Sequence, residues 1–205
     1  MKIKQSRQIK LPALPFRLTR RTGIAAGAAA VVLIIVFFSL FSGCGVSHGS
    51  PKSVTKSLIE AYGKRSERLV KDCYGQRKQT ESSLQTEIDT MMAYLDAHNT
   101  KDIHINKTDI LWEDETDACV YILYGLVLES GQEYPCLGTY VAEKKGGKYY
   151  ILPPSAIDGK ISSRTAEAFT KFMTMDTYKD YTKEYNTFVR KNPGYEEKIA
   201  TRMGE

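Results

Sequence analysis

The chain has 205 residues, enough for one ordinary domain with additional segments, and it carries 29 Lys and Arg against 24 Asp and Glu. Seven of the basic residues and none of the acidic residues precede residue 44, so residues 44–205 carry 22 basic and 24 acidic residues, a net charge of −2. A weakly acidic domain lacks the electrostatic footprint of a nucleic-acid-binding protein, and we therefore expect no nucleic-acid partner.

The chain begins with a basic leader and an apolar segment. All seven of these basic residues lie in residues 1–21, and residues 22–43 contain no charged side chain. The 18 residues from Ile24 to Phe41 read IAAGAAAVVLIIVFFSLF, which is near the short end of what spans a bilayer and longer than most signal-peptide cores. Because the positive charges precede this segment, the positive-inside rule places residues 1–21 in the cytoplasm and the later residues on the extracytoplasmic side of the cell membrane.

The residues that end the apolar segment, Leu40-Phe41-Ser42-Gly43-Cys44, resemble the lipobox of bacterial lipoproteins. In that family the cysteine becomes the lipid-modified first residue of the mature protein, so the resemblance implies removal of a signal peptide and lipid attachment at Cys44. Two acyl chains would give the stable anchoring that one chain does not. The alternative is an uncleaved transmembrane helix with an unmodified Cys44, which the long leader favours.

A spacer and two helices are predicted next. Residues 44–52 have the Gly, Ser and Pro content of a flexible linker, in which His48 is expected to be solvated. Ser50 as N-cap and Pro51 at the first helical position predict a helix over 51–72. A clean amphipathic pattern predicts a second helix from about residue 80 to about residue 99. Both helices belong to the extracytoplasmic domain, which we expect over 53–205.

Four short runs rich in Ile, Val, Tyr and Thr predict an antiparallel sheet. A two-residue turn at Ser130-Gly131 would place residues whose numbers sum to 261 opposite one another. The aliphatic face of the resulting hairpin is expected to carry the helices. The other face, which holds Cys119 and Cys136 too far apart for a disulfide, is expected to be a solvated surface, a pocket wall or a homodimer contact. The four predicted strands are 102–112, 117–129, 133–143 and 148–152.

The helical period returns after Pro154. Apolar residues recur every three to five positions over 162–190, and a short helix over 195–203 is expected to follow. An amphipathic helix has to bury its apolar stripe, so we expect the tail over 160–205 to pack on the domain itself.

Helices followed by a bent sheet that ends in Gly147-Lys148-Tyr149-Tyr150-Ile151 resemble the nuclear transport factor 2-like cone fold, particularly that of small Gram-positive bacterial lipoproteins. The resemblance covers residues 53–155 and implies an α+β domain whose curved sheet encloses a pocket. Relatives with this fold use the pocket for ligand binding, dimerisation or, occasionally, catalysis. The helical tail over 160–205 is not part of the minimal cone.

Patterns for catalysis and metal binding are scarce. The sequence contains no HExxH, GxSxG or paired CxxC motif, the acidic run 113–117 is typical of a charged turn, and we expect no metal or cofactor. His104 is the one candidate general base, for an isomerase or dehydratase, against the alternative of a surface histidine. We therefore expect a membrane-anchored cell-envelope lipoprotein whose domain binds a small ligand or an envelope protein without catalysis. The alternatives are the His104 enzyme and a single-pass membrane subunit of an envelope assembly.

Overall fold

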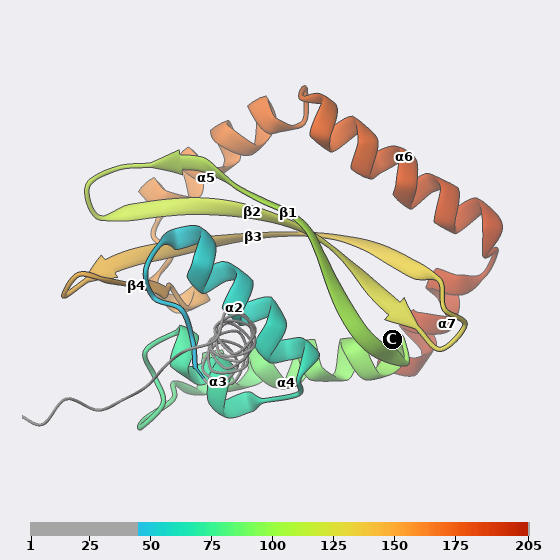
Figure 1. The fold of residues 1–205 in the computed structure, drawn as a ribbon, viewed down its shortest axis with the longest axis horizontal. Helices are drawn as coiled ribbons and strands as arrows, with labels where there is room; N and C mark the ends of the chain where they lie inside the picture. The colour runs from blue at the N-terminus through green and yellow to red at the C-terminus, as the bar shows by residue number, and fades with distance from the viewer. Residues whose placement is uncertain (1–44, 205) are drawn as a thin grey trace, which may run out of the picture. The chain divides into compact units, whose positions relative to one another are not determined.

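The computed structural model describes residues 45–204, which form an α+β fold with helices on both sides of one four-stranded antiparallel sheet (Figure 1). The strands are in the order β1-β2-β3-β4, and the sheet is open rather than closed. The elements are α2 (Pro51–Gly63), α3 (Glu67–Cys73), α4 (Ser82–Ala97), β1 (Thr100–Glu113), β2 (Asp117–Leu128), β3 (Glu133–Lys145), β4 (Lys148–Ile151), a 3₁₀ turn η1 (Pro154–Ala156), α5 (Gly159–Phe172), α6 (Asp176–Lys191) and α7 (Tyr195–Met203).

The predicted leader, apolar segment and lipid-bearing Cys44 lie outside the described residues. Within residues 45–204 no helix combines the length and the hydropathy needed to cross a membrane. The α+β class and the four antiparallel strands expected from the sequence are confirmed, with strand bounds within two residues of the expected ones.

The predicted helix over 51–72 starts where the sequence indicates but is two helices. Ser50 and Ser53 form a reciprocal capping box, in which each side chain accepts a hydrogen bond from the backbone N–H of the other. α2 then ends at a Schellman motif, with Arg65 at φ 51° and a hydrogen bond of 2.9 Å from the Ser66 N–H to the Ala61 carbonyl oxygen. This reversal turns α3 back against α2.

The β2–β3 hairpin has a different register from the predicted one. Tyr124 lies opposite Cys136, so paired residue numbers sum to 260 rather than 261. The loop contains three residues and ends at Gly131, whose φ of +79° provides the left-handed position that such loops require. A shift of one residue exchanges the two faces of β3, so Cys136 shares a face with Tyr124 while Cys119 lies on the other face.

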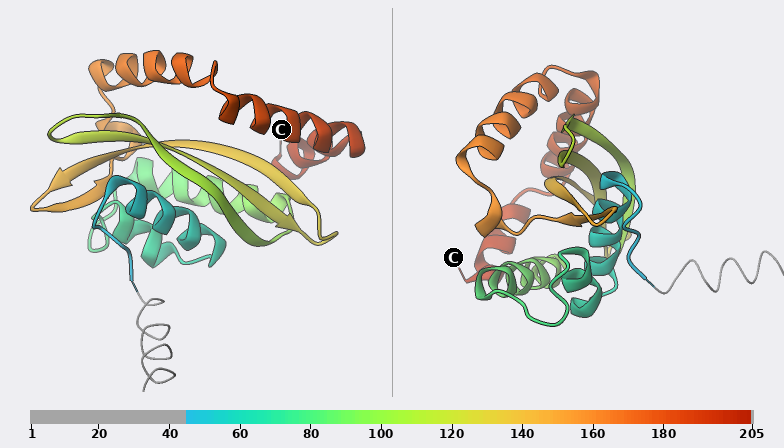
Figure 2. Two further views of the ribbon diagram at one scale, coloured as in Figure 1. Left: turned by 45° about the horizontal axis from the view of Figure 1, so that its top comes forward. Right: turned by 90° about the vertical axis from the view of Figure 1, so that its left-hand side faces the viewer.

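Helices cover both faces of the sheet, whereas the sequence led us to expect them on one. α2, α3 and α4 lie on one side, and α5 and α6 lie on the other (Figure 2). The main core lies between the sheet and the first group of helices and includes the completely buried Leu58, Leu84, Ile122 and Leu126. The face expected to be a solvated surface, a pocket wall or a homodimer contact is therefore covered in part by the chain's own tail.

The helical tail packs on the domain, as its amphipathic pattern predicts. It bends at residues 173–175 into α5 and α6, and each helix buries one phenylalanine. Phe172 packs on Tyr121 of β2 with ring centroids 4.4 Å apart, and Phe188 contacts Tyr134 of β3 edge-on at 5.1 Å. α6 thereby lies along the part of β3 that β4 does not pair with, which shields a sheet edge.

The start of the described chain is attached to the domain, which corrects the expected flexible spacer. The ring Nδ1 of His48 donates a hydrogen bond of 2.7 Å to the Tyr149 carbonyl oxygen, and the Tyr149 N–H donates one of 3.0 Å to the His48 carbonyl oxygen. Val46 packs against the main core. The segment from Val46 to Ser50 therefore lies beside β4, and His48 is not simply solvated.

Candidate functional site

A hollow of about 500 Å³ lies where α4, β3 and α5 meet. Its wall is formed by β3 around Tyr140, by the end of α3 at Tyr74, by Glu87 of α4 and by the first turns of α5 up to Phe169. β3 pairs with β4 only from Ala142 onward. The residues of β3 that line the hollow, 139–141, therefore precede the paired part of this strand. A gap in the sheet edge therefore opens between helices that belong to opposite faces of the sheet.

Glu87 is the one charged residue in the wall of this hollow, which we call the Glu87 hollow. The Tyr74 hydroxyl donates a hydrogen bond of 3.3 Å to Oε1 of Glu87. Oε2 of Glu87 is buried and has no hydrogen-bond partner among the described residues. Burial raises the pKa of Glu87, and the bond from Tyr74 opposes this only in part. A partly buried carboxylate with an unsatisfied oxygen is costly to the fold, and such groups concentrate at binding sites.

Phenol groups surround this carboxylate. Burial raises the pKa of Tyr62, Tyr74 and Tyr140 well above that of free tyrosine, and the negative charge of Glu87 raises each of them further. All three are therefore neutral hydroxyls at physiological pH. The hollow thus combines one carboxylate with several hydrogen-bonding hydroxyls and aromatic rings.

Tyr140 adopts its position because Gly138 leaves space for it. A Cβ atom on Gly138 would lie 2.8 Å from Cε2 of the Tyr140 ring, closer than real contacts allow. The tyrosine side chain therefore folds back along its own strand toward residue 138. This is a close approach that only glycine permits.

His104, the candidate base, is not in the hollow and is not enclosed. Its Nδ1 lies 2.7 Å from Oε1 of Glu133, and the two side chains are 59% and 43% exposed. The pair forms across β2 at Gly125, where a Cβ atom would lie 2.6 Å from the Glu133 carboxylate. One requirement for general-base catalysis, a polar partner within reach, is met, but a shielded site for the substrate is not.

A second hollow of about 590 Å³ lies between the sheet and α6. Its wall includes Glu133 and Pro135 from β3, and Asp180, Lys183 and Lys191 from α6. Charges of both signs alternate there, and none of its side-chain atoms is buried without a partner. The lining therefore indicates no particular ligand.

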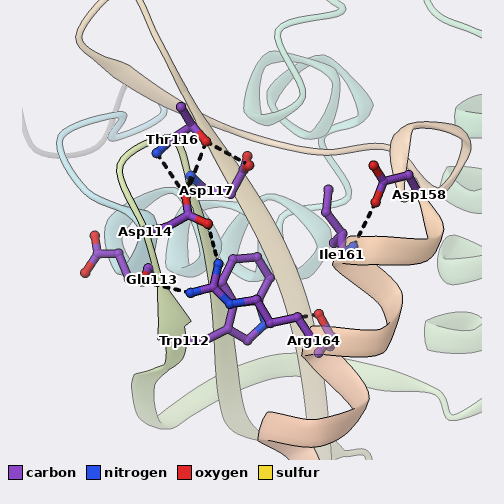
Figure 3. A network of polar contacts seen from close by, with 9 residues as sticks. Trp112, Glu113, Asp114, Thr116, Asp117, Asp158, Ile161 and Arg164 are labelled. Atoms are coloured by element: carbon purple, nitrogen blue, oxygen red, sulfur yellow. Dashed lines mark hydrogen bonds and ion pairs between the residues drawn. The ribbon is translucent and has the colours of Figure 1, made fainter.

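The acidic run 113–117 forms a charged turn, as expected, and Arg164 of α5 binds it (Figure 3). Asp114 accepts hydrogen bonds from the backbone N–H groups of Thr116 and Asp117, which lowers its pKa to about 2, with an ion pair to Arg164 contributing. The Arg164 guanidinium also lies 4.1 Å from the centre of the Trp112 ring. These groups satisfy one another and attach α5 to the β1–β2 turn, which is a structural role.

His98 is the C-cap residue of α4 and is buried. It is only 3% exposed, and burial together with nearby Arg202 lowers its pKa to about 4. Its ring lies among Tyr94, Tyr134 and Tyr195. A neutral imidazole in an aromatic cluster is therefore part of the contact between α4 and the tail.

The three cysteines of the described chain are free and buried. Burial raises the pKa of Cys73 and Cys136 to about 12 and that of Cys119 to about 11. The expected absence of a bridge between Cys119 and Cys136 agrees with this arrangement, although the reason differs, since they lie on opposite faces of the sheet. Thiols of this kind are unreactive. Within residues 45–204 no group of three or more His, Cys, Asp or Glu is placed to hold a metal ion.

The fold and the Glu87 hollow together define an open-sheet α+β domain with a small half-polar cavity at a sheet edge. No family model and no curated protein matches the chain. Among solved structures it is similar to the solution structure of a SEC-C motif containing protein from Rhodopseudomonas palustris, with 15% sequence identity and a TM-score of 0.37. That match covers 52% of this chain and 77% of the other.

Proposed function

We propose that the protein is a membrane-anchored, extracytoplasmic lipoprotein whose α+β domain binds a small ligand in the Glu87 hollow without catalysing a reaction. The observation that carries the binding function is the half-buried carboxylate of Glu87, which lies in the wall of a hollow that Tyr74 and Tyr140 also line and has no ion-pair partner among the described residues. A group of this kind is costly to bury unless a ligand completes its hydrogen bonds.

The anchor in this proposal rests on the sequence. The basic residues of 1–21, the uncharged segment over 22–43 and the lipobox-like residues before Cys44 support attachment of the lipid at that cysteine, with the domain outside the membrane. The resemblance to cone-fold lipoproteins supports the same location. A protein partner in the envelope and a homodimer are the alternatives to a small ligand.

No observation favours catalysis over binding. His104 and Glu133 are both exposed and lie outside the Glu87 hollow, and the phenols around Glu87 are neutral at physiological pH. We therefore assign Glu87 a role in binding and assign no proton transfer to it.

Mass spectrometry of the protein extracted from membranes tests the anchor. We expect a mature chain that begins at Cys44 and carries acyl chains, and a Cys44→Ser variant that carries none. An intact chain beginning at Met1 with an unmodified Cys44 would contradict the lipoprotein and leave the version with a spanning helix.

Native mass spectrometry of the full-length protein, followed by denaturation and small-molecule analysis, tests the binding function. An Ala166→Phe variant places a large side chain at the rim of the Glu87 hollow, and Ala166 is exposed, so the fold should tolerate it. We expect a co-purifying molecule with the wild-type protein and none with the variant. Recovery of the same molecule from both proteins would place it elsewhere.

A further inference from the structure

The lining of the Glu87 hollow carries a single formal charge, and that charge is negative. Glu87 is its one acidic residue, and no Lys, Arg or His of the described chain lines it. The ion pairs of the described chain lie elsewhere, so no protein cation offsets the Glu87 carboxylate. An anionic ligand would therefore be repelled by an uncompensated charge, while a cationic ligand would supply the missing one.

The hydrogen-bonding capacity of the Glu87 carboxylate makes the requirement on the ligand more specific. Oε1 of Glu87 already accepts a hydrogen bond from Tyr74, whereas Oε2 accepts none in the described part of the chain. Because Oε2 has almost no accessible surface, a ligand in the hollow meets the carboxylate at its accessible part, and it has to donate there through an N–H or O–H group. Hydrogen bonds between a charged donor and a carboxylate are roughly twice as strong as those between neutral groups. A quaternary ammonium has no N–H to donate, which leaves a primary ammonium as the better match.

The remainder of the wall is suited to an apolar body. Val141 and Leu152 contribute aliphatic surface, Phe169 contributes an aromatic ring from α5, and Tyr74 and Tyr140 add two phenol rings near the carboxylate. Aromatic faces attract cations as well as apolar groups. A volume of about 500 Å³ suits a compact molecule rather than a long chain.

We propose that the Glu87 hollow binds a small primary amine in its ammonium form, with the nitrogen donating to the Glu87 carboxylate and a compact apolar body lying against Val141, Leu152 and Phe169. This inference rests on the ligand-binding function proposed above and specifies the chemical class of the ligand. Burial destabilises the ionised form of Glu87 relative to the protonated form. A bound ammonium compensates the negative charge, so binding stabilises the ionised form.

A matched pair of fluorinated probes tests the ligand class. 4-Fluorophenethylamine carries a primary ammonium, and 2-(4-fluorophenyl)ethanol has the same apolar body with a neutral hydroxyl. The full-length chain is placed in lipid nanodiscs, empty nanodiscs serve as the blank, and binding is measured from the ¹⁹F relaxation of each probe. We expect the amine to bind about 10-fold more tightly than the alcohol, since hydrogen bonds to charged groups contribute more than those between neutral groups.

Three variants separate the contributions. Glu87→Gln keeps the shape of the side chain and removes the charge, so it should abolish the preference for the amine and leave the affinity for the alcohol unchanged. Glu133→Gln removes a carboxylate outside the hollow and should change neither affinity. Ala166→Phe should weaken both probes, because it obstructs the same cavity. A thermal melt of each variant verifies that it is folded.

Different results would overturn the primary amine as the ligand class and the small-ligand site itself. Equal affinity of the two probes, with Ala166→Phe weakening both, would overturn the amine as the ligand class and leave the small-ligand site in place. A preference for the amine that survives Glu87→Gln would also overturn it. If neither probe binds at millimolar concentration and no molecule co-purifies with the wild-type protein, both the amine class and the ligand-binding function are overturned.

Discussion

The Nδ1 atom of His98 lies 2.8 Å from the hydroxyl oxygen of Tyr195, and this contact joins the end of α4 to the start of α7. The two residues are separated by most of the domain in sequence. The opposite ring nitrogen, Nε2, is buried and has no hydrogen-bond partner among the described residues. The attachment of the tail therefore depends on an imidazole that remains neutral.

Stability should depend on pH through His98. The pKa of His98 is lowered from 6.5 to about 4 in the folded protein, so between these values the unfolded chain binds a proton that the folded chain does not. The stability that neutral, buried His98 contributes is fully retained above pH 6.5 and is lost as the pH falls toward 4. A pKa shift of this size corresponds to a decrease in the free energy of unfolding on the order of 3 kcal/mol.

Urea denaturation at a series of pH values measures this effect. A His98→Phe variant should show a flatter dependence between pH 6.5 and 4 than the wild type, because the titrating group is absent. His104→Gln, at the exposed histidine, should retain the wild-type slope. A His98→Phe variant with the wild-type slope would show that other groups cause the loss of stability.

Phe172 is the buried residue through which α5 packs on the sheet face that carries Tyr121. It is 1% exposed and packs on Tyr121, so Phe172→Ala should lower the free energy of unfolding by roughly 3–5 kcal/mol. The control is Met175→Ala, since Met175 is 53% exposed at the bend between α5 and α6 and should have little effect. Equal denaturation midpoints for the two variants would contradict this packing.

Deletion of residues 160–205 should expose the sheet surface that Phe172 and Phe188 cover. We expect the truncated domain to aggregate or to melt at a lower temperature, because it exposes a contiguous apolar patch. Light scattering and circular dichroism measure the two outcomes. A soluble truncated domain with an unchanged melting temperature would mean that the tail is an independent arm and would favour a protein partner over a small ligand.

The guanidinium of Arg164 above Trp112 should contribute a small coupling energy. A double-mutant cycle with Arg164→Gln and Trp112→Leu should give a coupling of about 0.5–1 kcal/mol, the range for a cation beside an aromatic ring at a partly exposed site. The cycle is measured by urea denaturation at neutral pH. A coupling energy of zero between Arg164 and Trp112 would mean that Arg164 acts only through its ion pair with Asp114.

Local signals in the sequence predict the strands and the helix starts of this domain well. They fail where the backbone conformation of a single residue determines the strand register or the end of a helix. Ser50 and Pro51 fix the start of α2 through their own chemistry. The register of β3 depends on whether Gly131 adopts a positive φ. The prediction assumed a two-residue turn and therefore assigned each residue of β3 to the wrong face of the sheet. Arg65 ends α2 in a left-handed conformation for which no glycine at that position gives a signal.

The candidate site was missed for a related reason. Glu87 lies three residues after Leu84 and four before Met91, so the helical period places it at the border of the apolar stripe, where a charged side chain is normally solvated. Tyr140 on β3 and Phe169 on α5 are distant from Glu87 in sequence, and only the fold brings all three to the wall of the same hollow. Gly138 was a usable signal, since a glycine within a strand often marks a close approach of another group.

The attachment of Val46 and His48 beside β4 limits how far the domain can lie from a membrane. If Cys44 carries the lipid, Gly45 is the only residue between it and the first side chain packed on the core. An extended chain advances at most about 3.6 Å per residue, so this tether has a reach of roughly 7 Å. Such a tether would keep the domain next to the bilayer surface, because it is too short to let the domain move freely away from its anchor.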